Sequence, residues 1–152
     1  MLNEDYKEML QELSAEKVRF LLVGAYALAV HGYPRATVDL DIWVRPSPDN
    51  AEAVLRALRR YGAYLGDLTA QDLQKEETVF QIGVAPRRID IMTTASGLQF
   101  DDAFNNSISL DIDGIPVHVP SINDLIRNKK AVGRTKDLAD IEALEALKEP
   151  EQ

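Results

Sequence analysis

An alternating segment that carries two aspartates places the tightest constraint on how this chain folds. In residues 37–44 (TVDLDIWV), aliphatic side chains recur at every second position, which predicts a strand with one buried face. Aspartate is disfavoured inside strands, so a pair of them in an otherwise apolar strand indicates a functional role. The pattern places Val38, Leu40, Ile42 and Val44 on one face, and Asp39, Asp41 and Trp43 on the other.

Two carboxylates on one face of a strand repel each other, and a divalent cation supplies the compensating charge. The chain has no cysteine and only two histidines, which excludes disulfides and disfavours a zinc centre. Hard cations held by oxygen, such as Mg²⁺, Mn²⁺ or Ca²⁺, therefore fit Asp39 and Asp41 best. The competing interpretation is that both acids belong to the solvated face of a sheet.

A third acid, Asp90, stands alone between two isoleucines in another strand-like segment, residues 88–93. If this strand lies beside the strand of Asp39 and Asp41, the three carboxylates form a triad for one or two Mg²⁺ ions. A place on a solvated sheet face is again the alternative.

Gly24 separates a short apolar run, residues 19–23 (RFLLV), from a helical segment, residues 25–31 (AYALAVH). The first turn of a helix presents free N–H groups that suit a phosphate, and glycine lets a ligand approach the backbone closely. Gly24 is therefore a candidate phosphate-binding position. Tight turns also use glycine for conformational reasons, so the assignment rests on its combination with the aspartate pair.

Helical and strand-like periodicities divide the rest of the chain into further elements. Helices first, a mixed sheet and helices last favour an α/β (α+β) fold in which helices flank the sheet. We expect a single domain over residues 1–152, with a core at about 16–120 and a C-terminal helical segment at about 121–148. The other expected elements are helices over 4–16 and from Ser47 or Asp49 to Tyr61, a short helix near Asp72, hairpins of 78–84 with 88–93 and of 108–112 with 115–119, and helices over 122–132, capped by Ser121, and 135–147.

The net charge of −8 argues against sequence-independent binding to nucleic acid. The N-terminal residues 1–13 lack the basic and apolar regions of a signal peptide, and the longest apolar run, residues 20–30, is shorter than the ~20 residues of a membrane span. We therefore expect a cytoplasmic protein with no membrane partner. The densest positive cluster consists of Arg127, Lys129, Lys130, Arg134 and Lys136.

These features together resemble the nucleotidyltransferase superfamily that includes DNA polymerase β and the aminoglycoside nucleotidyltransferases. Its signature pairs a hydrophobic-Gly-Gly/Ser turn with a later Asp-hydrophobic-Asp/Glu strand. Here Val23-Gly24-Ala25 and Asp39-Leu40-Asp41 match it, with Asp90 as the later strand carboxylate. The C-terminal stretch LIRNKKAVGRTKDLADIEAL is similar to the tail of small AbiEii-type nucleotidyltransferases from bacterial toxin–antitoxin systems, through Lys129, Lys136, Asp137 and Asp140.

The resemblance implies that a nucleoside monophosphate moves from an NTP to an acceptor hydroxyl, with Mg²⁺ or Mn²⁺ as cofactor and pyrophosphate as product. It implies that Asp39 and Asp41 hold both metal ions, and that Asp90 binds one of them and helps deprotonate the acceptor. Ala25 would offer a backbone N–H where relatives have a serine hydroxyl. The candidates for nucleotide binding are Gly24, Ala25, Arg35, Thr37, Lys129 and Lys130, and the candidates for supporting roles are Arg134, Lys136, Asp137 and Asp140.

Several candidates also have a purely structural interpretation. One helix can turn only one of Lys129 and Lys130 toward the site, and a solvated helix face explains both equally well. Asp137 suits the first turn of a helix. His31, near a helix end, is expected to cap or pack rather than act as a base. Trp43 shares the face of the two aspartates, so it either stacks on a nucleobase or belongs to the core or rim.

Two functions remain open from the sequence. The first is an active nucleotidyltransferase whose acceptor is RNA or tRNA, a protein or a small molecule. The second is a catalytically weak or inactive member that acts as an antitoxin-like or nucleotide-binding partner module, which the acidic charge and small size favour. A module that binds Ca²⁺ or Mg²⁺ without nucleotide chemistry is disfavoured, because the chain has no EF-hand-like loop.

Overall fold

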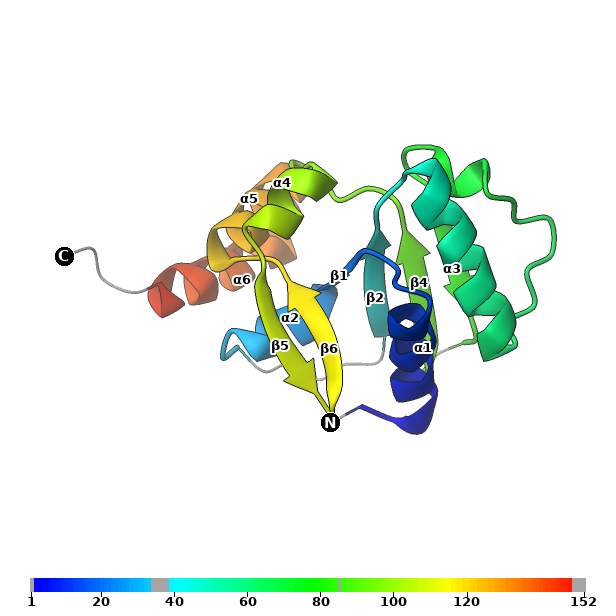
Figure 1. Cartoon of the computed structure of the whole chain (residues 1–152). Coiled ribbons are helices and arrows are strands. Elements are labelled where there is room, and N and C mark those ends of the chain that lie inside the picture. The colour runs from blue at the N-terminus through cyan, green and yellow to red at the C-terminus, as the bar shows by residue number, and fades with distance from the viewer. Residues whose placement is uncertain (1, 34–38, 85, 149–152) are drawn as a thin grey trace.

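The computed structural model describes residues 2–33, 39–84 and 86–148 (Figure 1). Its helices are α1 (Glu4–Ala15), α2 (Gly24–Val30), α3 (Pro48–Tyr61), the short 3-10 helix η1 (Asp72–Gln74), α4 (Phe100–Asn105), α5 (Ile122–Val132) and α6 (Thr135–Leu147). Its strands are β1 (Phe20–Val23), β2 (Asp39–Val44), β3 (Val79–Ile82), β4 (Arg88–Met92), β5 (Ile108–Ile112) and β6 (Ile115–Val119).

The main sheet has four strands in the order β1-β2-β4-β3. The β2–β4 pair is parallel, whereas β1–β2 and β3–β4 are antiparallel, so the sheet is mixed as predicted. The predicted hairpin of β5 and β6 forms a second, two-stranded sheet. Its turn places Asp113 and Gly114 at φ +52° and +84°, the left-handed conformations that a two-residue hairpin loop requires.

Helices α1 and α3 cover one face of the main sheet (Figure 1). Helix α1 buries on this face the residues that recur at helical spacing in the sequence, Tyr6, Met9, Leu10 and Leu13. The alternate residues of β2 and β4 supply the sheet's side of the same core, and the cluster extends as far as Leu144 of α6. Hydrophobic burial on this face, worth roughly 25 cal/mol per Å² of apolar surface, is what holds the strand order in place.

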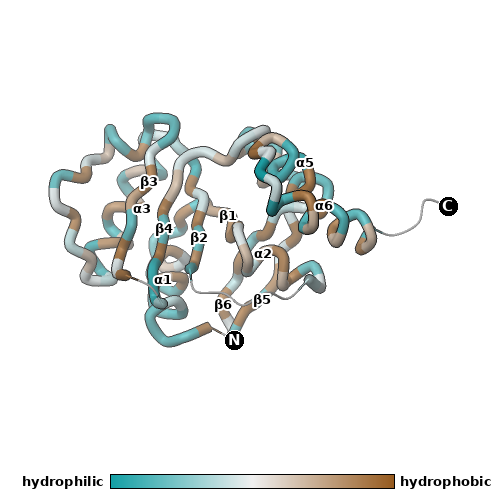
Figure 2. Tube along the Cα trace, turned by 180° about the vertical axis from the view of Figure 1, so that it is seen from behind, coloured by the Kyte–Doolittle hydropathy of each residue, from teal (hydrophilic) through white to brown (hydrophobic). Residues whose placement is uncertain are grey.

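The opposite face of the sheet, which Figure 2 views, is divided between an apolar cluster and the carboxylates. Trp43 is 1% exposed and packs edge-on against Phe100 of α4, with 5.2 Å between the ring centroids. Leu21 and Ala103 complete this smaller cluster. Of the two interpretations of Trp43, the structure therefore supports the core residue and not a nucleobase platform. Helix α4 was not predicted, because its six residues are too few to show a helical period.

The C-terminal part of the chain forms the two helices that the sequence predicts. Ser121 accepts a hydrogen bond from the Asp124 N–H and so caps α5, and Gly133 ends that helix with φ +71°. Helices α5 and α6 pack against each other. Within the described part of the chain, no helix has both the length and the apolar character to cross a membrane.

Candidate active site

Strand pairing brings the three predicted carboxylates together. In the parallel β2–β4 pair, Asp41 lies opposite Asp90, and Asp39 lies opposite Arg88. Since alternate residues of a strand share a face, all three carboxylates project from the second face of the sheet, below the Trp43 cluster. Asp90 is buried, whereas Asp39 and Asp41 are half-buried. The adjacency on which the predicted triad depends is therefore present.

Arg88 lies among these carboxylates, and the sequence analysis missed it as a site residue. Its Nη2 is 2.7 Å from Asp39 Oδ2 and 3.2 Å from Asp90 Oδ2, and its Nε is 3.1 Å from Asp90 Oδ1. The negative charge of Asp90 is the main cause that raises the pKa of Arg88 above its usual range. The signal was present in the sequence, because Arg88 and Asp90 are two positions apart in one strand and so share a face.

Burial and neighbouring charges both act on the Asp41 carboxylate. Burial, followed by the negative charges of Asp90 and Asp39, raises the pKa of Asp41 to about 6. The positive charges of Arg88 and Lys129 oppose this shift without cancelling it. A raised carboxylate pKa next to other acids marks a position where added positive charge is favourable.

Gly24 begins α2 in direct contact with this site. Its φ is +69°, and a Cβ at this position would overlap Asp41 Oδ2. Glycine is therefore required here for two reasons, the left-handed backbone and the approach of the Asp41 carboxylate. Ala25 follows in the first turn of α2, where its N–H belongs to the group that helices leave without an internal partner. Helix α2 has seven residues, so its dipole alone does not make a phosphate site.

Lys129 is the lysine of α5 that points toward α6. Its side chain is 15% exposed, and its Nζ lies 3.1 Å from Asp140 Oδ2 and 3.4 Å from Asp137 Oδ1. Its charge also acts on Asp41. Lys130 is 62% exposed and lies 3.9 Å from Glu145 on the other side of α5.

Asp137 and Asp140 are both buried on the face of α6 that meets α5. Asp137 also accepts hydrogen bonds from the Arg134 side chain at 2.9 and 3.1 Å and from the Arg134 N–H at 3.2 Å. These bonds are the main cause that lowers the pKa of Asp137 to about 2. Asp137 thus holds Lys129 and caps the helix at once, whereas Lys136 is exposed on α6. The structure supports the helix-start interpretation of Asp137, and its supporting role in the nucleotide site stays a prediction.

The sequence of residues 1–150 matches the family described as "nucleotidyltransferase of unknown function (DUF6036)". The chain belongs to this family. No curated protein matched the chain.

Two solved structures share the fold. A nucleotidyltransferase-like protein from Thermotoga maritima, TM1012, is 15% identical with a TM-score of 0.62, and the match covers 97% of each chain. The lincosamide antibiotic adenylyltransferase LnuA, solved with lincomycin bound, is 12% identical with a TM-score of 0.61, covering 97% of this chain and 99% of LnuA. At these identities the likeness establishes the nucleotidyltransferase fold and leaves the acceptor open.

The carboxylates fit the divalent cation that nucleotidyltransferases use, judged by their donor chemistry. Asp39 Oδ1 and Asp90 Oδ1 are buried and accept no properly aligned hydrogen bond from the described residues, although Arg88 Nε lies 3.1 Å from Asp90 Oδ1. Buried oxygens of this kind suit a hard cation held by oxygen. Within the described ranges, however, no three acidic or histidine side chains are already gathered as a metal site. The guanidinium of Arg88 occupies the position between Asp39 and Asp90.

Two nucleotide-binding candidates cannot be located, and His31 has a structural contact. Arg35 and Thr37 lie outside the described residues, so their assignment to the nucleotide stays a prediction. The Nε2 of His31 lies 2.7 Å from the carbonyl oxygen of Pro120 and must donate to it. His31 therefore ties the end of α2 to the segment before α5, as its structural interpretation requires.

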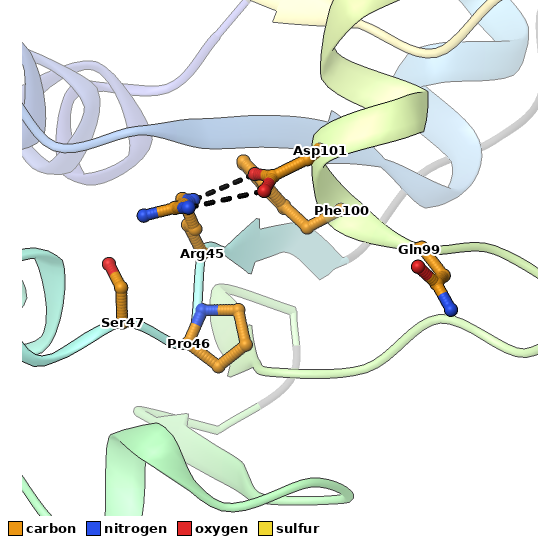
Figure 3. A pocket seen from close by; sticks show the side chains of 6 residues that line it. All are labelled: Arg45, Pro46, Ser47, Gln99, Phe100 and Asp101. Atoms are coloured by element: carbon orange, nitrogen blue, oxygen red, sulfur yellow. Dashed lines mark hydrogen bonds and ion pairs between the residues drawn. The ribbon is translucent and has the colours of Figure 1, made fainter.

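A pocket of about 210 Å³ lies at the far end of β2 from the carboxylates (Figure 3). Arg45 follows the last residue of β2 and pairs with Asp101 of α4 at 2.7 and 3.1 Å. Arg45 lies six positions after Asp39, a span of roughly 20 Å along an extended strand. This pocket therefore belongs to the junction with α4 and not to the carboxylate site.

Replacing Gly24 with alanine is expected to disable the carboxylate site more than it destabilises the fold. The left-handed backbone should cost about 1–2 kcal/mol, and the new methyl group should push the Asp41 carboxylate away from Asp90. We expect Mn²⁺ affinity, measured by isothermal titration calorimetry, to fall by about tenfold or more.

Gly114→Ala is the matched control for Gly24→Ala. Gly114 has φ +84° and open space around a Cβ, so it carries the same backbone cost without the overlap. Its variant should lose similar stability and keep Mn²⁺ affinity. Equal Mn²⁺ affinities in Gly24→Ala and Gly114→Ala would contradict the inference that Gly24 leaves the space that the Asp41 carboxylate needs.

Proposed function

We propose that this chain is an active, divalent-metal-dependent nucleotidyltransferase that moves a nucleoside monophosphate from an NTP to an acceptor hydroxyl. The observation that carries the proposal is the position of Asp41 directly opposite Asp90 on parallel strands, with Asp39 two residues away and Gly24 against Asp41. Membership of a nucleotidyltransferase family supports it. This grouping of one buried and two half-buried acids raises the pKa of Asp41 and has no evident structural benefit.

In this proposal Asp39, Asp41 and Asp90 hold Mg²⁺ or Mn²⁺, which would supply positive charge to the triphosphate and the leaving pyrophosphate. The first turn of α2, at Gly24 and Ala25, binds phosphate oxygens through backbone N–H groups, and Arg35, Thr37 and Lys129 are the side-chain candidates for the triphosphate. Lys130 is the weaker candidate, since it points to Glu145.

The chemical step forms a bond between the acceptor oxygen and the α-phosphorus and breaks the bond from that phosphorus to the pyrophosphate oxygen. Asp90 takes the proton of the acceptor hydroxyl. It is the most buried of the three carboxylates and lies opposite Asp41. The work of the chain in this step is to position the reactants and hold charge.

The acceptor is RNA or tRNA, a protein or a small molecule. The likeness to LnuA, an adenylyltransferase of lincosamide antibiotics, makes a small molecule with a hydroxyl a natural first choice. The tail with Lys129, Asp137 and Asp140 supports the toxin–antitoxin alternative of the AbiEii type, in which tRNA or a partner protein is modified.

A second candidate function is a nucleotide-binding or antitoxin-like module without catalysis. The contact of Arg88 with Asp39 and Asp90 favours it, because the guanidinium already neutralises part of the acidic site. This function predicts that nucleotides bind without being consumed.

Thermal unfolding with ATP, CTP, GTP or UTP, each with and without Mg²⁺, tests nucleotide binding at the site. A nucleotide at 100 times its Kd should stabilise the fold by about 2.7 kcal/mol, or roughly 5–11 °C in Tm. The Asp39→Asn/Asp41→Asn double variant should lose this shift, and Glu52→Gln, on the exposed face of α3, should keep it. A shift of equal size in the double variant would contradict the site.

Transfer itself is tested by incubating the protein with an NTP labelled at the α-phosphate. Separate reactions contain total tRNA, aminoglycoside and lincosamide antibiotics, or no added acceptor, so that label on the protein itself is detected. Label that moves to one of these pools in the wild-type protein, and not in the double variant, supports the enzyme and names the acceptor class. A Mg²⁺-dependent thermal shift without transfer or pyrophosphate release would favour the module instead.

A further inference from the structure

Arg88 is the feature of the site that the proposed chemistry does not require. One guanidinium serves two carboxylates, Asp39 at 2.7 Å and Asp90 at 3.1 Å, on the two neighbouring strands. It is a direct cross-strand partner of Asp39 and shares a strand face with Asp90. An arginine that bridges two acids lowers their repulsion and at the same time occupies the oxygens that a cation needs.

The bridge is incomplete as a hydrogen-bonded pair. Arg88 Nε, Asp39 Oδ1 and Asp90 Oδ1 are all buried without a properly aligned hydrogen bond to a described residue. One guanidinium also carries a single positive charge beside three carboxyl groups, and its ion pairs are with Asp39 and Asp90. A divalent cation can therefore gain from this site what Arg88 leaves unsatisfied.

The surroundings of Arg88 hold its backbone and leave its side chain room to move. The Tyr6 hydroxyl of α1 donates to the Arg88 carbonyl at 3.1 Å and to the Pro86 carbonyl at 3.3 Å, which fixes the start of β4. The Arg88 side chain is 35% exposed, against 10% for Asp90. The guanidinium can thus leave the carboxylates toward solvent by side-chain rotation, without a change in the sheet.

We propose that Arg88 is an internal counter-ion of the carboxylate site, which a divalent cation must displace from Asp39 or Asp90 in order to bind. This inference rests on the proposed function only in assuming that a cation binds these carboxylates. In the metal-free protein, Arg88 then stabilises the carboxylates by reducing their repulsion. The same contacts lower the affinity of the carboxylates for the cation. It is a positioning residue and not a catalytic one, since its partners are the carboxylates.

Calorimetric titration of the full chain with Mn²⁺, without nucleotide, tests this role. Arg88→Met removes the charge and should raise Mn²⁺ affinity by about tenfold or more. Arg88→Lys keeps the charge and loses the two-carboxylate bridge, so its affinity should fall between those of Arg88→Met and the wild-type protein. Arg87→Gln is the matched control for net charge, because Arg87 is the adjacent residue, is 64% exposed and pairs with Asp5. It should bind Mn²⁺ as the wild-type protein does.

A second measurement keeps the test valid if Arg88→Met does not fold. Nuclear magnetic resonance of the arginine Nε–H groups in the wild-type protein, with the Arg88 signal assigned by its loss in Arg88→Lys, should show that signal shift as Mg²⁺ is added. The Arg87 signal should stay in place.

The outcomes separate this inference from the proposed function. Mn²⁺ affinity that is unchanged or weaker in Arg88→Met, or an Arg88 signal that Mg²⁺ does not move, overturns the counter-ion role and leaves nucleotidyl transfer standing. Binding of Mn²⁺ that depends on Asp39 and Asp41 and tightens in Arg88→Met supports the role, whether or not any NTP is transferred. No Mn²⁺ binding in any variant contradicts both proposals.

Discussion

Replacement of Asp41 with asparagine is expected to stabilise the metal-free protein near pH 7.5 while it removes divalent-cation binding. Asp41 has its pKa raised from 3.8 to about 6, by burial first and then by Asp90 and Asp39. The folded state therefore holds its proton more tightly than the unfolded state does. The stability that the protonated form contributes is fully present below about pH 4 and is lost as the pH rises through 6.

The size of this effect follows from the shift. One pKa unit corresponds to 1.36 kcal/mol, which sets an upper limit of roughly 3 kcal/mol, and partial exposure of Asp41 reduces the expected gain to about 1–2 kcal/mol. In a chain of this length the gain corresponds to roughly 2–8 °C in Tm. Differential scanning calorimetry of wild-type and Asp41→Asn protein, in chelator, at about pH 4 and pH 7.5 measures it.

The gain should vanish near pH 4, where the wild-type carboxyl is already neutral. Glu52→Gln removes the same charge from the exposed face of α3 and should leave the Tm almost unchanged at both pH values. A lower Tm for Asp41→Asn at pH 7.5 would show that the ionised carboxylate stabilises the fold, and would contradict its assignment as a ligand held ready for a cation.

Replacement of Lys129 with methionine is expected to produce the largest loss of stability. Lys129 lies between Asp137 and Asp140, both buried, and its own side chain is 15% exposed. Removal of one partner from a buried ion cluster leaves uncompensated charge and typically costs about 3–5 kcal/mol. Asp137 keeps its bonds to Arg134, so we expect about 3 kcal/mol, or roughly 6–12 °C in Tm.

Lys130→Met is the matched control, since it removes the same group from the next residue of α5. Lys130 is 62% exposed and only 3.9 Å from Glu145, so its loss should cost less than about 1 kcal/mol. Urea unfolding of both variants gives the two values. Equal costs would mean that Lys129 does not join α5 to α6, and would leave phosphate binding as its role.

The sequence was sufficient wherever neighbouring residues decide the outcome. The alternation in 37–44 correctly separated the core face of β2 from the face of Asp39 and Asp41. The Asp113–Gly114 turn signal correctly predicted the β5–β6 hairpin, and Ser121 correctly predicted the start of α5. Both features depend on backbone conformations and hydrogen bonds within a few residues.

The tertiary structure decided which of these faces meet. Only the parallel pairing of β2 with β4, about fifty positions apart, places Asp90 opposite Asp41 and brings Arg88 to Asp39. Strand periodicity assigns a residue to a face and carries no information about the strand that lies alongside. The sequence therefore marked Asp90 as a candidate and placed Arg88 on the same face of its strand, but only the strand pairing shows that Arg88 also reaches Asp39.

The same limit applies to burial and to the choice between adjacent residues. Trp43 shares a face with the aspartates, and only the packing of α4 over one end of that face makes it a core residue. Lys129 and Lys130 are equivalent in sequence, and only the contact of α5 with α6 turns one of them toward two buried acids. The amino-acid sequence by itself predicted the described helices and strands other than α4, and it marked three acids that the fold brings together. Contacts between residues distant in sequence determined which charges neutralise those acids.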